Sequence, residues 1–116
     1  MIKSLPLKKL LHEIEFVPQA IISEPVVELA KRYGGEIEKG ADDFDFYEGS
    51  GALIDGTPFA IMHYQGHPKL TSTIYLPFDI QDVKEISKII FHIASELKLF
   101  GKIQWQREDE LKNRLK

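Results

Sequence analysis

Cysteine is missing from this chain of 116 residues, and its absence removes several kinds of chemistry at once. Without cysteine there is no disulfide framework, no thiolate nucleophile and no zinc site built on sulfur. A chain without cysteine fits the reducing cytoplasm, where disulfides are rare, and we expect the protein to reside there.

Long apolar runs are missing as well. No stretch approaches the roughly 20 apolar residues that a helix needs to cross a bilayer, so we expect no membrane partner. The segment that begins at Met1 has leucines and lysines but neither an uninterrupted apolar centre nor a small-residue cleavage site. It therefore does not have the pattern of a secretion signal.

An excess of basic residues is also absent. The formal net charge is −3, whereas a nucleic-acid-binding domain usually carries a basic surface, so we expect no nucleic-acid partner. The charges are unevenly spread, however. Seven acids and one base lie between Glu36 and Asp55, a local net charge of −6, and the segment from Lys98 onward has six bases and three acids.

Motifs that assemble a catalytic or cofactor site are lacking too. No serine sits in a Gly-x-Ser-x-Gly turn, and Gly34-Gly35 follows a predicted helix instead of opening one, which is the wrong order for a phosphate-binding loop. A calcium loop counted from Asp43 fails because Glu48 stands where glycine is required. We therefore predict no catalytic residues, no metal and no cofactor, and favour a protein that is not an enzyme.

What the sequence does contain is a clear fold pattern. Its 43% apolar and 28% charged residues are typical of one soluble globular domain spanning 1–116. The strongest local signal is Asp55-Gly56, which predicts a type I′ turn. That turn places Ile54 opposite Thr57, Ala52 opposite Phe59 and Ser50 opposite Ile61. The register directs Ala52, Ile54, Phe59 and Ile61 to one face, and Leu53, Ala60, Met62 and Tyr64 to the other.

Helical spacing marks three further segments. A short helix is expected over 5–16, capped by Ser4 and stopped by Pro18, and a second runs from its cap at Ser23 to Gly34. The longest helix is expected over 80–99, with a wide apolar stripe. Asp79 or Asp82 is expected to cap it, and Asp82-Val83-Lys84-Glu85 has the pattern of a capping box.

The remaining segments complete an α+β domain. Strands are expected over 71–76 and 102–107, with Thr71, Thr73 and Tyr75 on a solvated side. Residues 35–39 could form a short edge strand, and residues 44–48 either a strand or an ordered loop over the core. Residues 108–116 are expected to form a charged tail or frayed helix. The predicted fold is a mostly antiparallel sheet of four to five strands packed on the long helix. The two N-terminal helices are expected to cover part of the opposite face.

Two clusters are candidates for function. The first is acidic and aromatic, and consists of Asp42, Asp43, Phe44, Asp45, Phe46, Tyr47 and Glu48. Acids steer the encounter with a basic protein, and aromatic side chains supply buried area. An edge strand with its aromatic residues turned inward explains the same pattern without any partner.

The second cluster is a His-Tyr-His corner formed by His63, Tyr64 and His67. It could bind a ligand or a metal, or supply a general base, although no third metal ligand stands at a suitable spacing. Partly exposed polar residues beside a turn are the simpler interpretation. Trp105 is a further candidate anchor, and as a lone tryptophan on a terminal strand it is more often a lid on the core.

These patterns favour a non-catalytic protein-binding domain of the immunity or antitoxin type, which docks on a basic protein partner through the acidic and aromatic segment. One alternative is a small enzyme or a ligand- or metal-binding domain that uses the His-Tyr-His corner. Another is a homodimerising subunit of a larger assembly.

Overall fold

A computed structural model describes residues 1–43 and 45–107. Within these residues the chain forms three helices and a seven-stranded sheet. Along the sequence the elements are β1 (Ile2–Leu5), α1 (Leu7–Glu13), β2 (Phe16–Ile22), α2 (Val26–Lys31), β3 (Glu38–Ala41), β4 (Phe46–Ile54), β5 (Thr57–Tyr64), β6 (Ser72–Pro77), α3 (Val83–Leu97) and β7 (Ile103–Gln106). The tail predicted at 108–116 lies outside the described residues.

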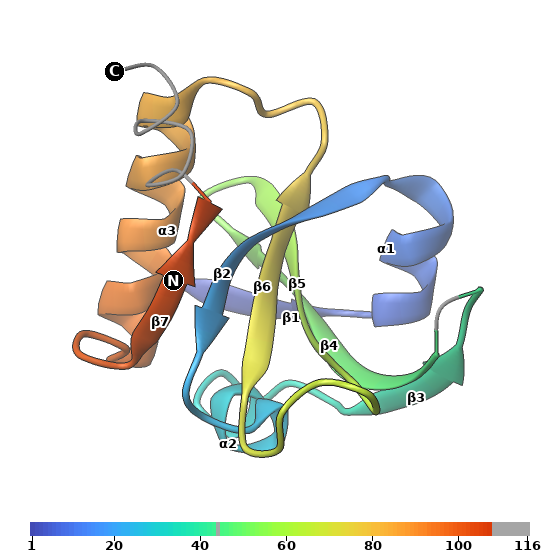
Figure 1. Cartoon of the computed structure of the whole chain (residues 1–116). Helices are drawn as coiled ribbons and strands as arrows, with labels where there is room; N and C mark the ends of the chain where they lie inside the picture. Colours follow the sequence, from blue (N-terminus) through green and yellow to red (C-terminus); the bar gives the residue numbers. More distant parts are fainter. Residues whose placement is uncertain (44, 108–116) are drawn as a thin grey trace.

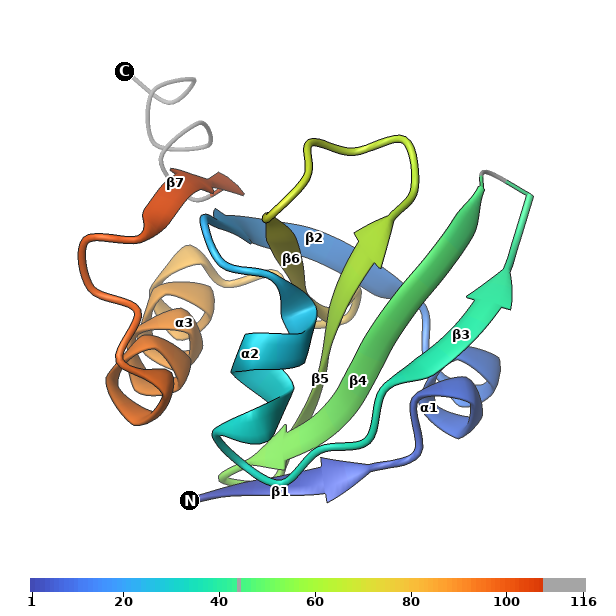
Figure 2. The same cartoon turned by 90° about the horizontal axis from the view of Figure 1, so that it is seen from below.

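The sheet is antiparallel throughout its described pairings and has the order β1-β4-β5-β6-β2-β7. One edge of β4 pairs with β5, and its other edge is shared by two short strands. β3 pairs with residues 46–49 and β1 with residues 51–54, so these two strands lie end to end along β4 (Figure 2). The α+β class is confirmed, with more strands than the four to five predicted.

Helices lie on both sides of the sheet, with α3 on one side and α1 on the other (Figure 1). The prediction that both N-terminal helices cover the face away from α3 is wrong for α2. Val26 and Leu29 of α2 pack in the same apolar cluster as Ile90 and Ile93 of α3. The short helix α1 is therefore the helix on the opposite face, where it contributes Leu7 to a second, smaller cluster.

The main core lies between the sheet and α3. Six residues of this helix are buried, Ile86, Ile89, Ile90, Ile93, Ala94 and Leu97. Burial of a large apolar side chain stabilises by about 1.5–3 kcal/mol, so the helix contributes on the order of 10 kcal/mol before conformational entropy is counted. Asp82 is the N-cap residue, as predicted, and its side chain accepts a hydrogen bond from the Lys84 amide.

The hairpin predicted from Asp55-Gly56 is confirmed in detail. The φ angles of 47° at Asp55 and 82° at Gly56 are the two positive values that a type I′ turn requires. Ile54 pairs with Thr57, and Ala52 pairs with Phe59. Because side chains alternate along a strand, the same register separates the two clusters, with Phe59 in the core below α3 and Met62 on the α1 side.

Three local predictions near the N-terminus are wrong. The helix expected over 5–16 is confined to Leu7–Glu13 and lies between two strands that were not predicted, β1 and β2. Neither expected serine caps a helix: the N-cap residues are Pro6 and Pro25. The Ser23 hydroxyl donates to the Lys102 carbonyl at 2.8 Å, which ties the start of α2 to the segment before β7.

The strand expected over 71–76 was predicted to have Thr73 on a solvated side, and this is wrong. Thr73 is buried, with 6% of its surface exposed. The reason is that β6 is an interior strand of the sheet, with β5 along one edge and β2 along the other. The final strand, expected over 102–107, is confirmed as β7. No helix in the described part of the chain is both long enough and apolar enough to span a membrane.

Helix α1 is held against the sheet by a carboxylate and two glycines. Glu38 of β3 accepts hydrogen bonds from the backbone amides of Leu7 and Lys8, the first residues of the helix. Gly49 and Gly51 allow the helix to approach β4 closely: a Cβ at Gly51 would lie 2.8 Å from Leu10 Cδ1, and one at Gly49 would lie 2.9 Å from Leu7 Cδ2. The helix therefore occupies a fixed place on this face.

Candidate binding surface

The two predicted clusters meet at one end of the sheet. The turn between β3 and β4 and the loop between β5 and β6 lie at this same end (Figure 2). The Gly66 amide donates to Asp45 Oδ2 at 2.7 Å, and the Tyr64 hydroxyl donates to Asp42 Oδ2 at 2.6 Å. The acidic and aromatic segment and the His-Tyr-His corner are thus parts of a single region.

The sheet divides the candidate residues between its two faces. Tyr47 and Tyr64 are cross-strand partners, and both pack on the α1 side with Met62. Glu48 and His63 form the neighbouring pair, so alternation directs them to the opposite face. Of the other candidates, Asp43 is exposed in the turn between β3 and β4, and Phe44 lies outside the described residues.

Three tyrosines form the centre of the α1 side. Tyr47 and Tyr64 pack edge to face with ring centroids 5.9 Å apart, and Tyr64 packs in the same way against His67 at 5.6 Å. Tyr75 of β6 lies opposite Ala60 and packs on the same cluster. We call Tyr47, Tyr64 and Tyr75, with Phe16, Asp42 and Asp45, the tyrosine surface.

The hydroxyls of this surface are held in their neutral form. Burial raises the pKa of Tyr64, and the hydrogen bond to Asp42 raises it further. Burial and the negative charge of Asp42 raise the pKa of Tyr75 to about 12. The pKa of Tyr47 is raised for the same two reasons, with a smaller effect from Glu38. These tyrosines therefore act as neutral hydrogen-bonding groups with aromatic faces.

Two adjoining cavities open on the tyrosine surface. The larger, about 610 Å³, is lined by Phe16, Pro18, Asp45, Tyr64, Gly66, His67 and Tyr75. The smaller, about 340 Å³, shares Phe16, Tyr64 and Tyr75 and adds Leu11, Ile14, Glu15, Asp42, Tyr47 and Met62. Three of the described lining residues are acids and none is lysine or arginine, so the local potential favours a cation.

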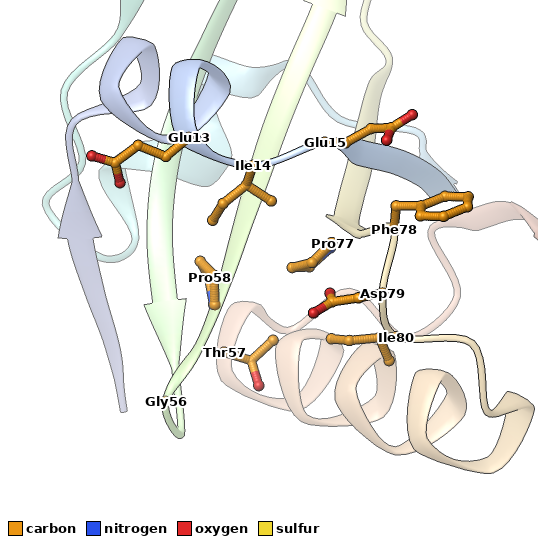
Figure 3. A pocket seen from close by; sticks show the side chains of 10 residues that line it. All are labelled: Glu13, Ile14, Glu15, Gly56, Thr57, Pro58, Pro77, Phe78, Asp79 and Ile80. Carbon is orange, nitrogen blue, oxygen red and sulfur yellow. The ribbon is translucent and has the colours of Figure 1, made fainter.

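A third cavity adjoins the smaller of these two near the end of α1 (Figure 3). Its volume is about 440 Å³, and it shares Ile14 and Glu15 with the smaller cavity of the tyrosine surface. Figure 3 shows Ile14 and Asp79 directed toward its middle, while the Glu13 and Glu15 carboxylates point outward. Acids also predominate here, which extends the negative character along this side of the molecule.

The opposite face has a different character at the same end of the sheet. A cavity of about 350 Å³ is lined there by Lys39, Phe46, Tyr47, Glu48, His63, Gln65 and Lys69, so both signs of charge are present. His63 Nε2 lies 3.1 Å from the Pro68 carbonyl oxygen. In residues 1–43 and 45–107, no three His, Asp or Glu side chains form a group that could hold a metal ion.

The sequence alone does not identify two members of the tyrosine surface. Its pattern predicts the end of a helix at Phe16 and a solvated strand face at Tyr75, whereas both line the cavities of this surface. Tyr47, in contrast, could have been joined to Tyr64 in advance. The Asp55-Gly56 register, continued for seven pairs beyond the Ile54–Thr57 pair, places these two tyrosines opposite each other.

Comparison of the chain with protein-family models, with curated proteins and with solved structures finds no match. The geometry of the tyrosine surface is therefore the guide to function.

Proposed function

We propose that this domain is a non-catalytic binding protein that docks on a basic segment of a protein partner through the tyrosine surface. The observation that supports this most directly is the lining of the two adjoining cavities, where aromatic rings stand beside Asp42, Asp45 and Glu15 and no described lysine or arginine intervenes. An inhibitor of the immunity or antitoxin type, which neutralises a basic protein, would use such a surface.

Physical chemistry assigns separate tasks to the two kinds of side chain. Acids around the cavities accelerate the encounter with a cationic partner and select against anionic ones. Tyrosines supply large rigid contact areas at low entropic cost, and they are frequent at the centres of protein interfaces. The pairing of Tyr47 with Tyr64, and of Tyr64 with His67, fixes the rings before a partner arrives.

The test is a titration followed by amide NMR spectra. The probe is a soluble peptide of alternating arginine, lysine and glycine, and a glutamate peptide of equal length is the control. We expect the basic peptide to shift the amides of β4, β5 and the β5–β6 loop, with an affinity that falls as salt is added. Equal shifts from both peptides, or shifts confined to α3, would contradict the proposal.

A pair of double variants tests the role of charge. Glu15→Gln with Asp43→Asn removes two exposed acids beside the tyrosine surface, since Glu15 lines the smaller cavity and Asp43 follows Asp42 in the chain. Glu28→Gln with Glu85→Gln removes two exposed acids on α2 and α3. The net charge changes equally in both. At about 0.2–1 kcal/mol for each of the two charge pairs lost, the first variant should weaken peptide binding about two- to thirtyfold and the second much less.

A further inference from the structure

We infer that the larger cavity of the tyrosine surface is a pocket for one arginine side chain of the partner. This inference rests on the proposed function and specifies its central contact. The cavity, at about 610 Å³, lies within the range of small-ligand sites. Its lining includes Phe16 and Pro18 of β2, Tyr75 of β6, Tyr64 of β5 and the acid Asp45.

The carboxylate of Asp45 is oriented before any ligand arrives. Asp45 Oδ1 accepts a hydrogen bond from the Phe46 amide at 2.7 Å, and Oδ2 accepts one from the Gly66 amide at 2.7 Å. Each oxygen retains a lone pair for a second donor. A carboxylate fixed at both oxygens has little entropy left to lose, and it matches the two parallel N–H groups of a guanidinium.

The aromatic wall is equally fixed. The hydroxyl of Tyr64 is held by Asp42 Oδ2 at 2.6 Å, and its ring packs between Tyr47 and His67. A guanidinium lying over the faces of Tyr64 or Tyr75 would gain a cation–π contact. The stem of an arginine side chain would meanwhile cover Phe16 and Pro18, since long cationic side chains bury their methylenes against apolar surface.

The geometry favours arginine over lysine. Guanidinium is planar, stacks on aromatic rings and binds a carboxylate through two parallel hydrogen bonds, whereas ammonium is a compact and strongly hydrated point charge. A pocket that combines ring faces with one doubly anchored carboxylate uses the first set of properties. Citrulline has nearly the shape of arginine but is uncharged. It therefore loses the attraction to the Asp45 carboxylate and the cation–π contact, and the apolar walls of the pocket offer no other interaction in their place.

The experiment is a titration with N-acetylarginine methylamide, with the lysine and citrulline analogues measured in parallel by amide NMR. We expect a saturable response in the millimolar range at Asp45, Tyr64, Gly66 and His67 for the arginine compound. The response should be at least fivefold weaker for lysine and absent for citrulline. Equal binding of the lysine or citrulline analogue, or a response located elsewhere, would overturn the inference.

Asp45→Asn tests the carboxylate, and Asp55→Asn is its matched control. Both remove one charge from an end of β4, and asparagine suits the type I′ turn at position 55. Asp45→Asn should weaken the arginine analogue at least fivefold, while Asp55→Asn leaves it unchanged. Tyr75→Leu removes an aromatic wall without changing the loop that holds Asp45, and it should also weaken binding of the arginine analogue. This second variant keeps the inference testable if Asp45→Asn does not fold.

The two proposals can fail separately. If the basic peptide still binds the tyrosine surface and still depends on Glu15 and Asp43, but Asp45→Asn and Asp55→Asn behave alike, then the arginine pocket is refuted and the docking function stands. If the basic peptide and the arginine analogue both leave the tyrosine surface unshifted, both proposals are refuted.

Discussion

Glu24 offers the sharpest test of how this fold is held together. It lies just before α2, and its side chain is 13% exposed. Arg32 Nη2 donates to Glu24 Oε1 at 2.7 Å, and Lys102 Nζ donates to the same oxygen. Arg32 also donates to the Leu97 carbonyl at 2.6 Å. The carboxylate therefore joins α2 to the end of α3 and to the segment before β7.

The substitution Glu24→Gln should cost about 2 kcal/mol of unfolding free energy. Hydrogen bonds to charged groups contribute about 1.5–3 kcal/mol each. Glutamine keeps one acceptor oxygen, and the half-exposed Lys102 ammonium can be hydrated by water instead. The loss of unfolding free energy should therefore equal about one such hydrogen bond. With an unfolding entropy of about 2.1 cal/mol/K for each of the 116 residues, the melting temperature should fall by about 8 °C.

The same contacts predict a pH dependence. The hydrogen bond from Arg32 lowers the pKa of Glu24 below its ordinary 4.5, against the opposing effect of burial. A carboxyl with a lowered pKa stabilises the fold above its unfolded pKa, and that contribution is lost as the pH falls through the folded pKa. The difference between wild type and Glu24→Gln should thus be full at pH 7 and narrow below 4.5.

The measurement is urea unfolding followed by circular dichroism at a series of pH values. Glu28→Gln is the matched control. Glu28 Oε1 lies 3.5 Å from Lys31 Nζ in an exposed ion pair within α2. We expect a change below about 0.5 kcal/mol for this control. The reasoning is refuted if Glu24→Gln and Glu28→Gln unfold alike at pH 7, or if the Glu24→Gln difference stays constant into the acid range.

Three further outcomes follow from contacts around α1 and the tyrosines. Glu38→Ala removes the acceptor for the Leu7 and Lys8 amides and should cost about 1 kcal/mol, with faster hydrogen exchange at those two amides; unchanged exchange would contradict the capping role. Gly51→Ala places a methyl group 2.7 Å from the Leu5 carbonyl oxygen of β1 and 2.8 Å from Leu10 Cδ1 of α1. It should cost about 1–3 kcal/mol in thermal unfolding, while a neutral effect would show that β1 and α1 can both move away. All four tyrosines have a raised pKa in the folded protein, so the ultraviolet titration of tyrosinate should begin above pH 10.0. Because the unfolded chain ionises more readily, this titration should coincide with loss of stability. A tyrosine that ionises near pH 10.0 while the protein is still folded would contradict this packing.

The parts of the fold that sequence predicts well are those decided by local chemistry. The Asp55-Gly56 turn fixes its own hairpin register, and the apolar stripe with the Asp82 cap identifies α3. β1 and β2 were missed because distant partners create them. Ile2 pairs with Ile54, and β2 is completed by β6 and β7. Pro18 also predicts the end of a helix, whereas in the structure it lies within β2, where the register shifts between Pro18 and Ala20 at a β-bulge.

The candidate site was predictable as two segments and not as one surface. The sequence marks Asp42–Glu48 and His63–His67 by composition, but their meeting depends on hydrogen bonds such as that from the Gly66 amide to Asp45. The assignment of Tyr47 and His63 to opposite faces follows from strand alternation. Phe16 and Tyr75 belong to the tyrosine surface because β2 pairs with β6. No local pattern in the sequence predicts that pairing.

The position of β2 between β6 and β7 sets the order in which the protein can fold during its synthesis. Ile22 pairs with Ser72, which follows it by 50 residues, and with Ile103, which follows it by 81. The apolar β2 segment therefore leaves the ribosome long before either neighbour exists. Such distant pairing slows folding and leaves strand edges open to association in the interval. A nascent chain of this protein should need chaperone protection until β6 has emerged, and it reaches its full sheet only once β7 is free.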